Sequence, residues 1–90
     1  MGRREKARKL YEKFGQSPHN VSFSDLCTLA EMVGFTFDRQ KGSHKIYRHA
    51  KQPKIMNFQE VDGKAKPFQV RQLLEFINEH NALNDEVRDV

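Results

Sequence analysis

Hydrophobic residues recur with a helical period in three parts of the chain. Apolar side chains spaced three and four positions apart predict amphipathic helices over residues 3–14, 22–33 and 67–79. Gly15 stands where the first helix should end, Ser22 with Asp25 resembles an N-terminal capping box, and Pro67 suits the first position of the last helix. From Asn81 onward the chain is polar, and we expect it to fray.

Between the second and third predicted helices the period of the pattern changes from about 3.6 to 2. Apolar and polar residues alternate in a way that predicts strands over residues 35–38, 44–49 and 54–60. The short connections, of which residues 40–43 form the first, favour antiparallel neighbours. We therefore expect an α+β fold of order α-α-β-β-β-α, with helices on one face of a three-stranded antiparallel sheet and an open opposite face.

The composition is that of one small domain of 90 residues. Its single cysteine, Cys27, lies between leucines and reads as a small buried side chain in a reducing compartment. No apolar run approaches the length of a membrane span, and no apolar stretch of a signal peptide follows the basic N-terminus. We therefore expect a cytoplasmic protein that does not associate with membranes.

The positive charge is concentrated in the middle of the chain. The net charge is +4, but residues 39–71 carry nine basic residues against only Glu60 and Asp62. Such an asymmetry indicates a polyanionic partner such as a nucleic acid, although a scattered solvated surface would give similar numbers.

The most informative stretch is Gly42-Ser43-His44-Lys45, which places a histidine at the start of a predicted strand. Imidazole can move a proton at neutral pH, because its unperturbed pKa is about 6.5. A phosphodiester is attracted to cations, and RNA supplies its own nucleophile in the 2′-hydroxyl. A histidine among basic residues is therefore the minimum that cutting RNA requires.

Strand alternation leaves two orientations of His44 open. It places His44, Ile46 and Arg48 on one face and Lys45, Tyr47 and His49 on the other. If Tyr47 packs toward the helices, His44 lies on the open face and Ile46 is exposed unless a partner protein covers it. The opposite orientation buries Ile46 and makes His44 a structural residue.

Candidate RNA-binding residues lie on both sides of His44. They are Arg39, Lys41, Gly42, Ser43, Lys45, Arg48, Lys64, Lys66 and Arg71. Glycine allows a phosphate to approach backbone N–H groups, and the last three residues flank a helix N-terminus, which attracts anions. The other histidines lack the spacing of metal ligands and no carboxylate cluster accompanies the basic stretch, so we expect no metal site and no cofactor.

The residues between positions 34 and 74 resemble those of the HicA toxin family. The resemblance rests on residues 39–49 around Gly42-Ser43-His44, on Asn57-Phe58-Gln59, and on the run that begins Gly63-Lys64-Ala65-Lys66-Pro67. HicA proteins are small bacterial mRNA interferases of toxin–antitoxin systems. The resemblance implies an αβββα fold like that of a double-stranded-RNA-binding domain (dsRBD), a ribonuclease whose catalytic residue is His44, and a HicB-like antitoxin that covers this histidine.

The resemblance also divides the chain. It extends over residues 21–81, which we expect to form the HicA-like domain. Residues 1–20 would form a helix and linker before that core, and residues 82–90 an acidic tail.

The expected reaction is cleavage of mRNA with His44 as general base toward the 2′-hydroxyl. Lys41, Lys45 or Arg48 would neutralise charge on the phosphate. A lysine, water or the same histidine could protonate the leaving 5′-oxygen. Two other interpretations stay open: a non-catalytic RNA-binding module of dsRBD-like fold, and a subunit whose basic face binds an acidic protein.

Overall fold

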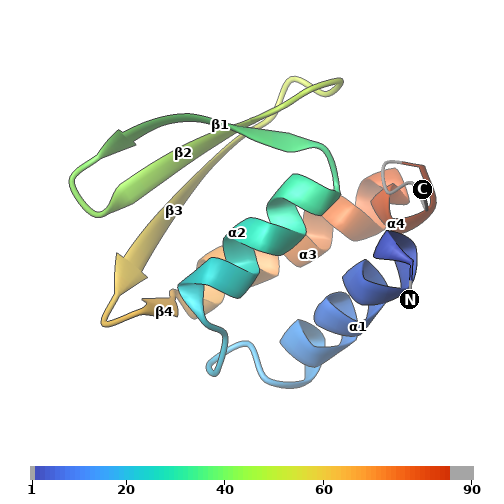
Figure 1. The fold of residues 1–90 in the computed structure, drawn as a ribbon, viewed down its shortest axis with the longest axis horizontal. Helices are drawn as coiled ribbons and strands as arrows, with labels where there is room; N and C mark the ends of the chain where they lie inside the picture. The colour runs from blue at the N-terminus through green and yellow to red at the C-terminus, as the bar shows by residue number, and fades with distance from the viewer. Residues whose placement is uncertain (1, 86–90) are drawn as a thin grey trace.

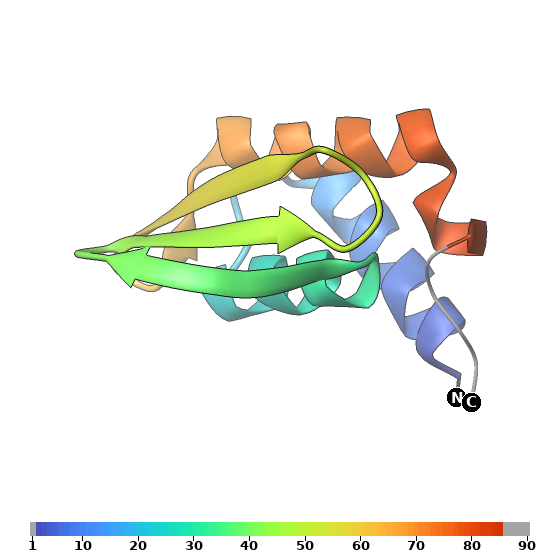
Figure 2. The same ribbon diagram turned by 90° about the horizontal axis from the view of Figure 1, so that it is seen from above.

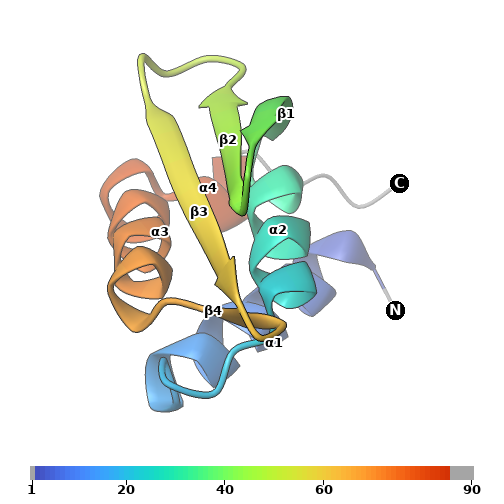
Figure 3. The ribbon, with the colours of Figure 1, turned by 90° about the vertical axis from the view of Figure 1, so that its left-hand side faces the viewer.

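The computed structural model describes residues 2–85. The elements are α1 (Arg3–Gln16), α2 (Phe23–Met32), β1 (Phe35–Lys41), β2 (His44–His49), β3 (Ile55–Val61), β4 (Lys64–Ala65), α3 (Pro67–His80) and α4 (Ala82–Asp85). The strands form one antiparallel sheet in the order β1-β2-β3-β4. Helices α2 and α3 lie side by side under this sheet, and α1 packs against them from the far side (Figures 1 and 3). Figure 2 looks down on the face of the sheet that the helices leave open.

This architecture confirms the predicted fold class, an α+β domain of dsRBD-like αβββα type with an additional N-terminal helix. The Ser22 cap is also confirmed, because the Ser22 hydroxyl accepts a hydrogen bond from the Asp25 N–H at 3.1 Å. Helix α1 continues one residue past Gly15, so the predicted stop at this glycine was wrong. The turn at Pro18 follows directly, because proline cannot extend the helical ladder.

Two short elements were not predicted. Strand β4 adds a fourth strand next to the end of β3, and the N–H of Ala65 also donates to the Val21 carbonyl at 2.9 Å. Beyond α3, Asn81 adopts the left-handed conformation and α4 follows, with Ala82 fully buried. The expected fraying from Asn81 is therefore wrong for this turn, while residues 86–90 of the predicted acidic tail lie outside the described residues.

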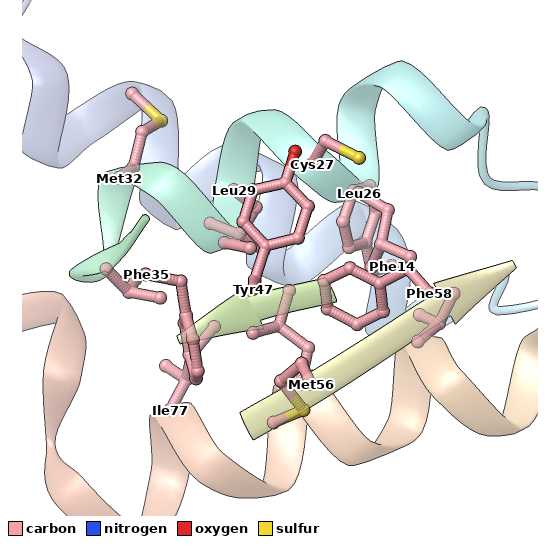
Figure 4. Close-up of a cluster of buried hydrophobic side chains, with 14 of the residues drawn as sticks. Phe14, Leu26, Cys27, Leu29, Met32, Phe35, Tyr47, Met56, Phe58 and Ile77 are labelled. Atoms are coloured by element: carbon pink, nitrogen blue, oxygen red, sulfur yellow. The ribbon is translucent and has the colours of Figure 1, made fainter. Parts of the chain in front are cut away.

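The hydrophobic core lies between the sheet and the helices (Figure 4). Phe35, Tyr47 and Phe58 point from three strands toward the helices, and each is at most 2% exposed. Phe14 of α1 is also fully buried, so the N-terminal helix is part of the same core. No helix among residues 2–85 has the length and apolar character that crossing a bilayer would require.

Candidate functional site

Strand β2 presents His44, Ile46 and Arg48 on the open face of the sheet. Its other face points to the helices, where Tyr47 and His49 are only 2% and 5% exposed. Because side chains alternate along a strand, burial of this pair places His44 on the opposite face, where it is partly exposed. The first of the two orientations considered above is therefore the observed one.

The ring of His44 is held by a neighbouring strand. Its Nδ1 lies 2.9 Å from Oδ1 of Asn57, which projects from β3 onto the same face. An amide oxygen can only accept a hydrogen bond, so Nδ1 is the donor. Among the residues that the structure describes, the His44 ring makes its hydrogen bond through Nδ1 alone.

The turn before His44 is short and is held by contacts with Gln59 of β3. Strand β1 extends to Lys41, so the connection is the two-residue turn Gly42-Ser43, with Gly42 at a φ of +61°. The side-chain amide of Gln59 donates to the Ser43 hydroxyl at 3.4 Å. The backbone N–H of Gln59 donates at 2.8 Å to the side-chain oxygen of Gln69, a buried residue of α3. A chain of amides therefore connects α3 to the turn that positions His44.

Three predicted basic residues share the open face with His44. Lys41 is the β1 partner of His44, and Arg39 is the β1 partner of Ile46. Arg48 lies two residues along β2 from Ile46, and its Nη2 is 3.4 Å from a carboxylate oxygen of Asp38. The same oxygen lies 2.6 Å from Nη1 of Arg39. Asp38 stands at the irregularity between Phe37 and Arg39, and it links the two arginines.

The remaining predicted RNA-binding residues lie elsewhere. Lys45 is on the helix side of the sheet, with Nζ 5.7 Å from the centroid of the Phe23 ring. Lys64 lies in β4, Lys66 directly precedes α3, and Arg71 lies in α3. The β3–β4 turn lies at the same end of the molecule as the Gly42-Ser43 turn (Figure 1), but these three residues follow that turn and are not on β1 or β2, the strands that carry Arg39, Lys41 and Arg48.

Two of these three cations contact the α1–α2 connection. Nζ of Lys64 donates to Oδ1 of Asn20 at 2.9 Å, and Nη2 of Arg71 lies 3.4 Å from Nε2 of His19. The segment between the N-terminal helix and the family core therefore orients basic side chains at this end of the molecule.

His49 has both ring nitrogens engaged by the backbone. Nε2 donates to the carbonyl of Val33 at 2.9 Å, and Nδ1 accepts from the N–H groups of Lys51 and Gln52, each at 3.0 Å. The ring also packs edge-on against Phe35. These contacts assign His49 a structural role in holding the connection between β2 and β3.

Two buried groups on the helix side stay protonated. Burial raises the pKa of Tyr47 above its ordinary value, and its hydroxyl donates to Glu31 at 3.4 Å. Burial also raises the pKa of the Cys27 thiol, which agrees with its reading as a small core residue. Neither group reaches the open face. Among residues 2–85, no group of three or more His, Cys, Asp or Glu side chains is arranged to hold a metal ion.

Sequence reasoning missed Asp38 and Asn57. Alternation along residues 54–60 places Asn57 on the same face as Ile55 and Gln59, but its contact with His44 depends on the register between β2 and β3, which the irregular residues 50–54 conceal. The bulge that brings Asp38 to the two arginines leaves no recognisable signal in the sequence.

Comparison with known proteins identifies a family for most of the chain. The model of the family described as HicA toxin of bacterial toxin-antitoxin matches residues 23–77, which begin at α2 and end in α3. None of the curated proteins and none of the solved structures compared with the chain matches it significantly.

Proposed function

Because the chain belongs to the HicA toxin family and is therefore the toxin of a toxin–antitoxin pair, we propose that it is a metal-independent endoribonuclease that cleaves mRNA. The observation that carries the proposal is the position of His44. Its ring lies on the open face of the sheet, is held through Nδ1, and has Arg39, Lys41 and Arg48 on the same face.

The proposed reaction uses the 2′-hydroxyl of the RNA as nucleophile. Nε2 of His44 takes its proton, the 2′-oxygen attacks the adjacent phosphorus, and the bond from phosphorus to the 5′-oxygen breaks. Arg39, Lys41 and Arg48 neutralise the charge that grows on the phosphate oxygens. The leaving 5′-oxygen receives a proton, so the products are a 2′,3′-cyclic phosphate and a 5′-hydroxyl.

The same face fits the antitoxin that the family membership implies. Ile55 is 52% exposed and the neighbouring Ile46 is partly exposed, so apolar side chains lie among the basic ones. We propose that a HicB-like antitoxin covers this face, contacts both isoleucines and keeps RNA away from His44. Such a complex should persist at high salt, because screening weakens the charged contacts but not the apolar ones.

The proposal is tested by incubating the purified protein with a defined RNA and with its all-2′-deoxy counterpart. We expect cleavage of the RNA alone, with cyclic-phosphate ends. His44→Ala should lower the single-turnover rate by about 10²- to 10⁴-fold, the usual contribution of a general base, and leave RNA affinity nearly unchanged.

His80→Ala is the matched control, because His80 lies at the end of α3 against Phe76 and away from the open face. Products that end in a 3′-hydroxyl would contradict the mechanism. RNA binding without cleavage by the unmodified protein would indicate the non-catalytic RNA-binding module instead.

A further inference from the structure

We propose that Asn57 determines which ring nitrogen of His44 carries the proton, and thereby leaves Nε2 free to accept a proton from RNA. Its consequence for cleavage depends on the ribonuclease function proposed above. The state of the ring can be measured without any cleavage, so the two proposals can fail separately.

The register of the sheet brings the two side chains together. Ile46 pairs with Asn57 and His44 pairs with Gln59, so Asn57 is the diagonal neighbour of His44 across the β2–β3 ladder. Both side chains project onto the open face, and the resulting distance from Nδ1 to Oδ1 is 2.9 Å.

The chemistry of this contact selects one tautomer. A neutral imidazole carries its proton on one nitrogen and a lone pair on the other, and the hydrogen bond made by one nitrogen decides the state of the other. Since the amide oxygen accepts, the proton lies on Nδ1 and the lone pair lies on Nε2. The ring is also kept from turning, because a flipped ring would lose this contact.

The other groups around the ring do not offer this function. On β1, the partner of His44 is Lys41, whose ammonium has no lone pair to accept a proton. The Asp38 carboxylate is engaged with Arg39 and Arg48, and the side-chain amide of Gln59 donates to Ser43. Asn57 is therefore the group that sets the tautomer.

The same contact bears on how the leaving 5′-oxygen obtains its proton. After His44 has taken a proton, both ring nitrogens are donors, and Nδ1–H remains bound to Asn57. The new proton on Nε2 then faces the RNA and can be delivered to the 5′-oxygen. Asn57 thus keeps its hydrogen bond to the ring in both protonation states of His44, and the proton on Nε2 can be returned in a later step, directly or through a water.

Two substitutions separate the hydrogen bond from the shape of the side chain. Asn57→Leu keeps a similar size and removes the acceptor, while Asn57→Asp keeps an acceptor. Asn57 is exposed, so neither change disturbs the core. The matched control is Asn78→Leu, because Asn78 is an exposed residue of α3 at a cavity formed with Arg8 and Tyr11.

The first measurement is ¹⁵N NMR of the His44 ring in each labelled protein at a pH where the ring is neutral. We expect the Nδ1–H form in the unmodified protein, in Asn57→Asp and in the control, and a mixture of both tautomers in Asn57→Leu. An Nε2–H ring in the unmodified protein, or an unchanged ring in Asn57→Leu, would overturn the inference.

The second measurement is the single-turnover cleavage rate together with RNA affinity. Asn57→Leu should slow cleavage by between about tenfold and a hundredfold, the loss that is typical when the hydrogen-bond partner that orients a metal-bound histidine is removed. Its RNA affinity should stay the same, and Asn57→Asp should retain more of the rate.

The controls distinguish the two proposals. Cleavage that survives His44→Ala would overturn the catalytic role proposed for His44 and leave the NMR result unaffected. Cleavage that requires His44 but proceeds at full rate in Asn57→Leu would overturn only the role of Asn57.

Discussion

Replacing Asp38 by asparagine should strengthen RNA binding. The Asp38 carboxylate lies 2.6 Å from Arg39 and 3.4 Å from Arg48, so it occupies guanidinium donors that a phosphate would use. Asparagine keeps the size of the side chain and removes its charge. The perturbation therefore frees two cations on the open face without changing the strand.

The size of the effect follows from the charge that is removed. A phosphate bound by the two arginines would lie about 5 Å from the carboxylate, where two unit charges in water repel each other by about 0.8 kcal/mol. This corresponds to about fourfold in affinity. Each further phosphate contact also steepens the dependence of log K on log salt by about 0.7 for a single strand.

The assay is equilibrium binding of a fluorescent RNA by proteins that carry His44→Ala, so that the RNA stays intact. Glu75→Gln is the control, since it removes one negative charge from α3, away from the open face. We expect Asp38→Asn to bind more tightly than the control at low salt, with the difference shrinking as salt rises. Equal affinities of the two variants, or weaker binding by Asp38→Asn, would show that Asp38 does not compete with RNA for the arginines.

Three further predictions concern the core and the antitoxin. His49→Phe should lower the free energy of unfolding in urea by about 2–4 kcal/mol, because it removes the acceptor of two backbone N–H groups and the donor to Val33; a loss below about 1 kcal/mol would contradict the role of this ring. Burial raises the pKa of Tyr47 in the folded state, so stability should be lost as the pH rises above about 10, where the unfolded tyrosine ionises. Tyr47→Phe should flatten this alkaline slope in urea titrations while Tyr11→Phe should not, and identical slopes would refute the assignment. Ile55→Ser should weaken antitoxin binding about tenfold in calorimetry and leave cleavage by the toxin alone unchanged. An unchanged affinity for the antitoxin would show that the antitoxin binds elsewhere.

The sequence predicted the elements whose signals are local. The Ser22 cap, the start of α3 at Pro67 and the strand from His44 to His49 each depend on a few neighbouring residues, and all are observed. The two-residue strand β4 has too few residues for a period. It forms because Val21, in the connection before α2, accepts a hydrogen bond from Ala65, which is a tertiary contact.

The orientation of β2 could not be decided from its pattern. Both faces carry a large apolar residue, Ile46 on one and Tyr47 on the other, so hydrophobicity alone does not choose between them. The choice becomes clear only with the neighbours in place: Tyr47 reaches Glu31 on α2, and His49 bonds to Val33 at the end of the same helix. The polar ends of these two side chains, which the pattern counts against burial, are satisfied inside the fold.

The two histidines of β2 show how the fold separates a structural imidazole from the one that we propose to be reactive. His44 and His49 are five residues apart, an odd number, so strand alternation places them on opposite faces. Both nitrogens of His49 are bound to backbone groups, so protonating its ring would break the contacts that hold the β2–β3 connection. His44 makes its hydrogen bond at Nδ1 to a side chain that can stay in place in either protonation state, so its ring can gain and lose a proton at Nε2 while the fold is unchanged. A difference in hydrogen-bonding partners, rather than in residue type, therefore makes one of them suited to catalysis.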